Sequence, residues 1–275
     1  MKFIFSIVLL TLNTIVFSQQ TAGPKIASGK YTIEPSTYVV IDDEEISIDN
    51  AVQLNLGSIK GKYHTYSENN YNYLDVTSYD GKKYLFSYSV IEDILFLYSM
   101  TNGGCIFASI LPVKGEFSRI VNYFSFKASS YLVEYIRDRE YRYPPENLSS
   151  DKINPPWAEG ADGDGIGEWI TFYFNYESRS FYIFNGYFDP KFPDLYTRNN
   201  RIKRIRLEAY SEQNRTFETF KYSHEFDLED TPQIQKLEIP IGYKYFKMVI
   251  LGVYKGTHYE DTCLSGVYTD ERWGM

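Results

Sequence analysis

Alternation of apolar and polar residues runs through most of the chain and predicts β-strands. In the segment 84–90, Tyr84, Phe86, Tyr88 and Val90 stand at every second position, which gives the strand one apolar face. Asp80-Gly81 stands just before this segment, and Asp-Gly between alternating runs is typical of a β-hairpin turn. The segment from about 31 to 111 therefore predicts a meander of strands.

The second half alternates in the same way, with a charged face. Ile205, Leu207 and Ala209 fall on one side of the segment 201–210, and charged residues fall on the other. Further strands are expected in 168–174, 180–186, 220–228, 236–241 and 246–254. About seven or eight strands separated by turn residues predict a sandwich or jelly roll.

The segment between the two halves interrupts this pattern. Pro144-Pro145 blocks regular structure, and the only short helix is expected within Tyr131–Arg139. Tyr, Phe and Trp together make up 18% of the chain, and these residues favour strands. The expected fold class is all-β, with a first domain at 19–123, a β-meander or β-barrel-like unit of unknown role, and a second domain from about 124.

The N-terminus carries an apolar run, residues 3–17, behind Lys2. A basic start, an apolar core of about 7–15 residues and a small residue at the break are typical of a secretory signal peptide. We predict a signal peptide at 1–18, cleavage after Ser18, and a secreted, periplasmic or cell-envelope location. An uncleaved membrane anchor is the alternative, although a span needs about 20 apolar residues. No later segment of the sequence has the length and apolarity of a transmembrane span.

Net charge bears on the kind of partner, and cysteine content bears on disulfide bonding. The net charge of −8 disfavours a nucleic-acid partner, because phosphate binding needs basic clusters. Cys105 and Cys263 are too few for a disulfide framework, and buried free thiols are slightly favoured over a bridge between them.

Four segments of the second half occur in a specific order. They are "YPPENL", "WAEGADGDGIGEWITFYF", "NGYFDPKFPDLYTRNNRIKRIRL" and "VYKGTHYEDTCLSGV". Together they resemble a bacterial domain of the galactose-binding-like, discoidin (coagulation-factor 5/8 type C-like) class, of the NAD glycohydrolase translocation type. The resemblance covers about residues 124–275 and does not extend to 19–123.

This resemblance implies an eight-stranded β-sandwich jelly roll. It also implies a non-catalytic module that binds a glycan or another cell-surface component. It does not imply NAD hydrolysis, which belongs to a separate catalytic domain in that family.

The stretch "WAEGADGDGIGE" (157–168) interleaves acidic residues with glycines, as a calcium loop does. Ca²⁺ takes about 6–8 oxygen ligands, and an EF-hand places them between two helices, whereas this stretch precedes a strand. Relatives in the discoidin class carry a carboxylate where this chain has Ser149 and another where it has Gly266. No cofactor is therefore expected, and a structural Ca²⁺ is disfavoured. The glycines are expected to form a tight turn, with Glu159 and Glu168 holding Arg201.

Aromatic platforms with planar polar groups beside them are the usual chemistry of a sugar site. The candidate ligand-binding residues are Trp157, Glu159, Tyr187, Tyr196, Asn199, Asn200 and Arg201. Some of them also have a structural interpretation: Trp157 as a core residue, and Asn199-Asn200 as part of a turn, since Asn tolerates left-handed backbone conformations.

Two other function classes stay open at this stage. The chain is interpreted as non-catalytic, but Glu159 and Glu168 provide an acidic pair of the kind used in glycoside or NAD hydrolysis. A cell-envelope interaction or structural protein without sugar binding is the second alternative. His224 lies on an aromatic strand face and is expected to be a hydrogen-bonded core histidine.

Overall fold

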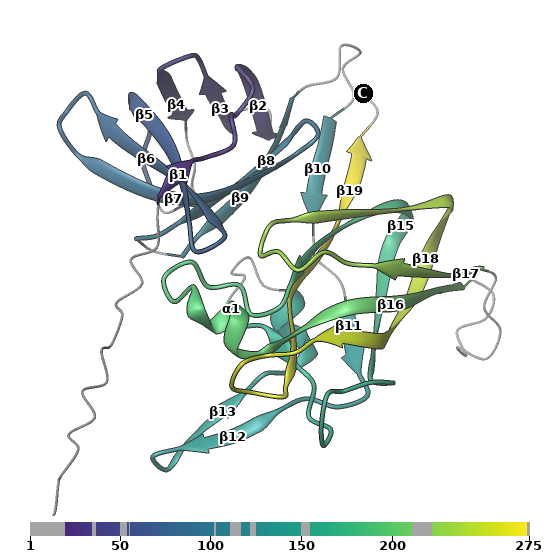
Figure 1. Ribbon diagram of the computed structural model, residues 1–275. Helices are drawn as coiled ribbons and strands as arrows, with labels where there is room; N and C mark the ends of the chain where they lie inside the picture. Colours follow the sequence, from purple (N-terminus) through teal and green to yellow (C-terminus); the bar gives the residue numbers. More distant parts are fainter. Residues whose placement is uncertain are drawn as a thin grey trace, which may run out of the picture.

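The computed structural model describes residues 20–34, 37–49, 54, 56–101, 103–110, 117–121, 125–149, 155–210 and 222–273. These residues form two large β-sheets, a two-stranded hairpin and one short α-helix (Figure 1). The fold class is all-β, as predicted. The predicted signal peptide lies outside the described residues. Across the described ranges, no helix has the length and apolarity needed to cross a membrane.

The first sheet closes on itself. Its main strands are β2 (Gly29–Glu34), β3 (Thr37–Ile41), β4 (Glu45–Asp49), β5 (Ile59–Glu68), β6 (Tyr71–Ser78), β7 (Lys83–Ile91), β8 (Ile94–Ser99) and β9 (Cys105–Ile110). Each strand pairs antiparallel with the next, and β9 pairs with β2. The result is an eight-stranded up-and-down barrel, with the short strand β1 (Thr21–Ala22) added to β5.

Alternation decides which side chains fill the barrel. Phe86 and Tyr88 of β7 are buried in the interior, and Tyr84 and Val90 pack against them, as the period of two predicted. The predicted Asp-Gly turn joins β6 to β7: Gly81 has a φ of 84°, and its N–H donates to the carbonyl of Ser78 at 2.9 Å. Eight strands enclose an interior just wide enough for side chains, and here apolar side chains fill it.

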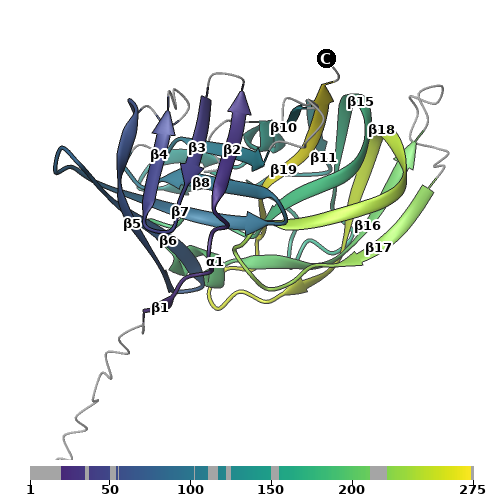
Figure 2. The same cartoon turned by 90° about the horizontal axis from the view of Figure 1, so that it is seen from above.

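The second sheet is the jelly roll. Its strands are β10 (Phe117–Val121), β11 (Ser125–Ala128), β14 (Trp157–Ala158), β15 (Trp169–Asn185), β16 (Asn200–Tyr210), β17 (Tyr222–Asp227), β18 (Gln235–Tyr254) and β19 (Thr262–Trp273). The hairpin strands β12 (Val133–Ile136) and β13 (Arg139–Arg142), the 3-10 helix η2 (Pro145–Ser149) and α1 (Asp194–Arg198) connect them. The two strands predicted at 168–174 and 180–186 form one long strand, β15, whose register shifts where it pairs with β18. Figure 2 shows how β15 and β18 curve around the core.

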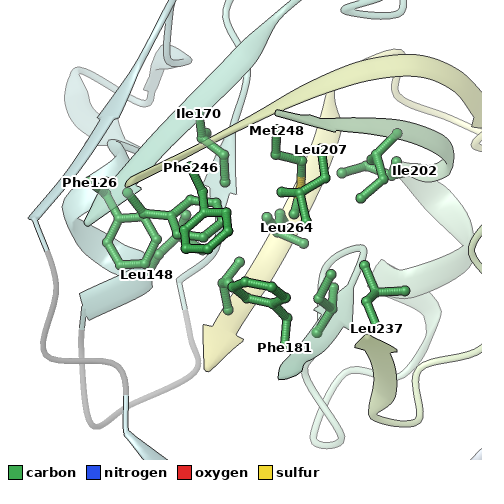
Figure 3. Packing of buried hydrophobic residues seen from close by; sticks show 14 of the residues in the cluster. Phe126, Leu148, Ile170, Phe181, Ile202, Leu207, Leu237, Phe246, Met248 and Leu264 are labelled. Carbon is green, nitrogen blue, oxygen red and sulfur yellow. The ribbon is translucent and has the colours of Figure 1, made fainter. Parts of the chain in front are cut away.

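The jelly-roll core is aromatic at one end and aliphatic at the other. Phe172, Phe181 and Phe246 contact one another, with ring centroids 4.8–6.0 Å apart. Figure 3 shows the rings of Phe181 and Phe246 beside aliphatic side chains from β16, β18 and β19. Ile205 and Leu207 of β16 point into this core, which confirms the predicted face of that strand.

The barrel and the jelly roll share a third apolar cluster. Outward-facing residues of β6 and β8 pack against residues of β15 and the segment that follows it. Phe96 of the barrel lies 4.6 Å from Phe184 and 6.0 Å from Phe188, measured between ring centroids. Gln233 of the jelly roll also accepts hydrogen bonds from Asn72 and Ser89 of the barrel. The outer face of the barrel is therefore part of a continuous core.

Strand β10 joins the second sheet although it precedes residue 124. Its residues pair with β19, from Phe117 opposite Trp273 to Val121 opposite Thr269. The boundary at 123/124 stays a prediction, and this pairing favours an earlier one.

Candidate functional site

A cavity of about 190 Å³ lies between the β12–β13 hairpin, the segment after β15, α1 and the start of β19. The apolar part of its wall consists of Leu132, Ile136, Ala158, Leu195 and Cys263. Its polar lining consists of Glu134, Tyr143, Tyr187, Asn199, Tyr259 and Asp261. Concave sites with an apolar wall and a few convergent polar groups are the usual form of a small-molecule site.

The β12–β13 hairpin provides one wall, in the region where the sequence predicted a helix. That prediction is wrong: Arg137 and Asp138 both have positive φ, 49° and 63°, and form a two-residue turn between paired strands. The alternating and aromatic residues around the turn fit a ladder better than a helix. The hairpin places Glu134 and Tyr143 beside the cavity.

Two tyrosines meet in the cavity wall. The hydroxyl of Tyr143 donates to Oε1 of Glu134 at 2.7 Å, and the ring of Tyr143 meets that of Tyr187 edge to face, with centroids 6.5 Å apart. Burial raises the pKa of both tyrosines, and the hydrogen bond to Glu134 raises that of Tyr143 further. Both hydroxyls are therefore protonated donors at physiological pH.

The opposite wall is acidic. Burial raises the pKa of the Asp261 carboxyl, and the negative charge of Glu134 adds to the shift. Burial also raises the pKa of the Cys263 thiol, as do the neighbouring carboxylates. Cys105 and Cys263 are both buried and unbridged, as the sequence favoured.

The segment after β15 is fixed on both sides of Tyr187. On one side, the N–H of Gly186 donates to the carbonyl of Cys263 at 3.2 Å. On the other, the N–H of Phe188 donates to Oγ of Ser265 at 2.8 Å. Tyr187 itself is half-buried, and its ring lines the cavity. The position of Tyr187 is thus fixed by the hydrogen bonds that its two neighbours make to β19.

The remaining wall comes from α1 and the segment before β19. Asn199 caps α1, with Nδ2 donating to the carbonyl of Leu195 at 2.8 Å, so its Oδ1 is the atom left for other partners. Nη2 of Arg198 donates to the hydroxyl of Tyr259 at 2.9 Å. Arg198 also pairs with Asp194 at 3.3 Å.

Three of the residues expected to bind ligand are buried in structural roles. Trp157 is 1% exposed and donates from Nε1 to the carbonyl of Ser130 at 3.1 Å. Glu159 is fully buried, and its carboxylate accepts the N–H groups of Ala161 and Thr262. Tyr196, 2% exposed, donates to Asp230 at 3.1 Å.

Arg201 is also buried, but its partner differs from the expectation. Asp230, rather than Glu159 or Glu168, receives a bidentate pair from Arg201, with Nε and Nη2 at 3.0 and 2.6 Å from its carboxylate oxygens. Nη1 donates to the carbonyls of Asn199 and Lys255. Glu168 instead accepts hydrogen bonds from serine hydroxyls. The expected partners of Arg201 were wrong because its actual partner, Asp230, lies in a loop 29 positions further along the chain, and no sequence pattern indicates that the two side chains meet.

Asn200 fastens the loop before β19 to the glycine-rich stretch. Its Nδ2 donates to the carbonyl of Glu260 at 2.6 Å and to Asp164 at 3.1 Å, while its Oδ1 accepts the N–H of Gly256. The structure thus brings Tyr187 and Asn199 to the cavity and places the other candidates behind it. A direct role of those buried residues in ligand binding stays a prediction, and their burial favours a supporting role.

The glycine-rich stretch is a turn built around Glu159. Gly165 has a φ of 67°, and a Cβ at this position would lie 2.5 Å from Cδ of Glu159. Asp164 is paired with Lys255 and Asn200. Among the described residues, no group of three or more His, Cys, Asp or Glu side chains is arranged to hold a metal ion. The positive φ values of Gly163, Gly165 and Gly167 give this stretch the turn geometry that the sequence predicted.

Sequence reasoning missed four of the six polar residues that line the cavity. These are Glu134, Tyr143, Tyr259 and Asp261. Tyr259 and Asp261 lie inside the ordered motif "THYEDTC", which was a usable signal. His224, expected in the core, is exposed on the edge strand β17. Tyr222 and Phe226, on either side of His224 along the same face, are only partly buried against the jelly-roll core, and the His224 side chain between them is open to solvent.

Comparison with known proteins identifies the second half. A sequence model of the family described as the NAD glycohydrolase translocation F5/8 type C domain matches residues 121–270. No curated protein matches the chain.

Solved structures show low similarity to this chain. The family 32 carbohydrate-binding module of NanJ from C. perfringens, solved with galactose, has 12% identity and a TM-score of 0.38, over 56% of this chain and 100% of that one. The CBM32 of AlyQ, solved with 4,5-unsaturated mannuronic acid, has 14% identity and a TM-score of 0.37, over 55% and 96%. The lectin binding domain of Lectinolysin, solved as a His 62 mutant with Lewis b, has 9% identity and a TM-score of 0.33, over 57% and 93%.

Proposed function

The chain belongs to the family of NAD glycohydrolase translocation F5/8 type C domains, and from this premise we propose that it is an exported, non-catalytic protein that binds carbohydrate in the tyrosine-lined cavity. The observation that carries this proposal is the convergence of Tyr143, Tyr187 and Tyr259 with two carboxylates around one cavity. The sugar is part of a glycan or another cell-surface component.

The chemistry of the cavity suits a sugar ring. The apolar face of a sugar packs against tyrosine rings, and its hydroxyls need acceptors and donors at the rim. Glu134, Asp261 and Oδ1 of Asn199 supply acceptors, and Tyr187 supplies a donor. At about 190 Å³ the cavity is below the usual range for drug-sized ligands, so it fits one ring rather than a chain of rings.

A hydrolytic function has weaker support. Glu159, the acidic residue considered as a general acid or base, is fully buried and occupied by two backbone N–H groups. Glu168 is occupied by the hydroxyls of Ser129 and Ser130. Incubation with NAD and with chromogenic glycosides is expected to give no turnover, and turnover lost in Glu159→Gln would contradict the non-catalytic proposal.

A cell-envelope interaction protein without sugar binding is the second candidate. One observation favours it: the β12–β13 hairpin exposes Val133 and Tyr135, which share one face of β12 and are 39% and 69% accessible to solvent. Exposed apolar side chains that lie together are a feature of interaction surfaces. In this alternative the hairpin, rather than the cavity, contacts the partner.

A glycan array with the full chain separates the two candidates. Sugar binding predicts a signal for a defined set of glycans that is lost in Tyr187→Ala and kept in Tyr79→Ala. Tyr79 is a suitable control because it is 59% exposed on the barrel, away from the cavity. An array signal that Tyr187→Ala leaves unchanged would contradict the cavity as the site.

Export is tested separately. N-terminal sequencing of protein recovered from the culture medium or cell envelope is expected to begin at Gln19, after removal of residues 1–18. Recovery of the intact N-terminus in the membrane fraction would support the anchor instead.

A further inference from the structure

The charges around the cavity are of one sign. Of the eleven described residues that line it, two are ionisable acids, Glu134 and Asp261, and none is a lysine or arginine. Among the described residues, neither carboxylate has a lysine or arginine partner. Glu134 accepts the hydroxyl of Tyr143, which satisfies one oxygen and leaves its charge in place. Within the described ranges, the cavity thus holds two carboxyl groups without a basic side chain beside them.

Cations close to the cavity are already paired. Arg198 reaches the hydroxyl of Tyr259, but its guanidinium forms an ion pair with Asp194 at 3.3 Å. Lys255 forms its ion pair with Asp164. Within the part of the chain that the structure describes, these nearby cations are engaged elsewhere, so a bound ligand can supply the positive charge for Glu134 and Asp261.

Nearby negative charge raises the pKa of two groups that line the cavity, the Asp261 carboxyl and the Cys263 thiol. The raised pKa of Asp261 has burial as its main cause and the charge of Glu134 as the next. The pKa of the Cys263 thiol is raised by burial and then by Asp261, Glu159 and Glu134. A cavity walled by protein strengthens such fields, so it attracts cations and repels anions.

Tyrosine rings reinforce the same preference. The faces of aromatic rings are negative, and they attract an ammonium group within about 6 Å of the centroid. Tyr143 and Tyr187 present two such rings beside the carboxylates, whereas the guanidinium carbon of Arg198 already lies 5.1 Å from the ring centroid of Tyr259. An ammonium group in this cavity can contact rings and carboxylates together, whereas a carboxylate of an acidic sugar meets repulsion from both.

We propose that the cavity is selective for an amino sugar, a sugar ring that carries a free protonated amine, over the N-acetylated, neutral and acidic forms of the same ring. The proposal rests on the proposed carbohydrate-binding function and adds the charge of the ligand to it. Glu134 and Asp261 bind the ammonium group, and the tyrosines hold the ring.

Isothermal titration of the full chain with matched sugars at pH 7 tests this selectivity. The probes are glucosamine and galactosamine, their N-acetyl forms, glucose and galactose, and glucuronic and galacturonic acid. An amino sugar is expected to bind at least about tenfold more tightly than its N-acetyl form, because acetylation removes the charge-assisted hydrogen bonds of the ammonium group. The uronic acids are expected to show no binding.

Two variants assign the preference to the carboxylates. Glu134→Gln and Asp261→Asn are each expected to remove most of the difference between the amino and N-acetyl sugars, with the protein still folded by circular dichroism. Asp138→Asn is the matched control, because Asp138 is exposed at the tip of the hairpin and Asn tolerates its positive φ. It is expected to keep the wild-type difference.

The outcomes separate this inference from the proposed function. Binding of neutral, N-acetylated or acidic sugars as tightly as amino sugars would overturn the selectivity and leave carbohydrate binding intact. Tetramethylammonium serves as a further probe that carries the charge without a sugar ring. If the protein bound tetramethylammonium but none of the sugars, or bound none of the probes, both the selectivity and the carbohydrate-binding function would be overturned.

Discussion

The hydroxyl of Tyr73 in the barrel donates to the carbonyl oxygen of Pro190 in the jelly roll at 3.2 Å. Pro190 lies three residues after Tyr187, and the intervening Phe188 and Asp189 are buried against the barrel. The segment 187–190 therefore places Tyr187 in the cavity wall and is anchored to the barrel through its next three residues. This arrangement gives the barrel a structural role in the site.

Removal of that hydroxyl tests the anchor. Tyr73→Phe keeps the ring in the shared cluster and leaves a buried carbonyl without its donor, which costs about 1–3 kcal/mol of unfolding free energy. Urea denaturation measures this loss. Tyr79→Phe is the control, because Tyr79 is exposed and its loss is expected to be within about 0.5 kcal/mol. Equal effects of the two substitutions would contradict the anchor.

The glycine-rich turn makes a second prediction. Gly165→Ala combines a positive φ of 67° with a Cβ 2.5 Å from the side chain of Glu159, and it is expected to cost more than about 2 kcal/mol. Gly163→Ala has a similar φ of 92° with open space around the added Cβ, so it is expected to cost about 1 kcal/mol. Thermal unfolding of the two variants measures the difference. If Gly163→Ala were as damaging as Gly165→Ala, the turn would not be built around Glu159.

The ionised Asp261 carboxylate is expected to lower the free energy of unfolding of the protein, although it is proposed to bind the ligand. Its folded-state pKa is raised, so the folded protein holds this proton more tightly than the unfolded chain does, and its contribution destabilises the fold above the folded-state pKa. Asp261→Asn is therefore expected to raise the unfolding free energy at pH 7 by up to about 1 kcal/mol, a limit set by solvent screening. The gain is expected to shrink as the pH falls through the folded-state pKa of Asp261, which lies above its ordinary 3.8.

Unfolding curves of Asp261→Asn and the wild type at several pH values provide the measurement. Glu134 and Glu260 are the acids that raise this pKa. A variant less stable than the wild type at pH 7 would show that the carboxylate stabilises the fold instead.

Chelation addresses the proposal that the chain needs no structural calcium. Asp164 is paired with Lys255, and the Glu159 carboxylate is occupied by backbone N–H groups. EDTA is therefore expected to leave the melting temperature unchanged, since removal of an ion bound only by the folded state would lower it. A fall in melting temperature that added Ca²⁺ restores would contradict this expectation.

The fold was largely predictable from local pattern, because a period of two identifies strands and their buried faces. Ile205 and Leu207 point into the core as their alternation required. The helix expected at Tyr131–Arg139 failed because a two-residue turn with positive φ at Arg137 and Asp138 produces a hairpin instead. A two-residue turn of this kind is hard to recognise in a sequence when neither of its residues is glycine or asparagine.

The site was harder to predict than the fold. Trp157 and Arg201 have side chains suited to sugar binding, and both are buried in packing and hydrogen bonds that link distant segments. The cavity forms where residues such as Glu134 and Asp261, more than a hundred positions apart, meet across the jelly roll. Such convergence depends on tertiary contacts that no local pattern encodes.

Tyrosine-selective NMR of the full chain is the most direct test of carbohydrate binding in the cavity. With labelled tyrosine rings, titration of the best array ligand is expected to shift the signals of Tyr143, Tyr187 and Tyr259, assigned by Tyr→Phe substitution, and to leave that of Tyr79 unmoved. Shifts confined to other tyrosines, or no shift at saturating ligand, would contradict the central claim that this cavity is the sugar site.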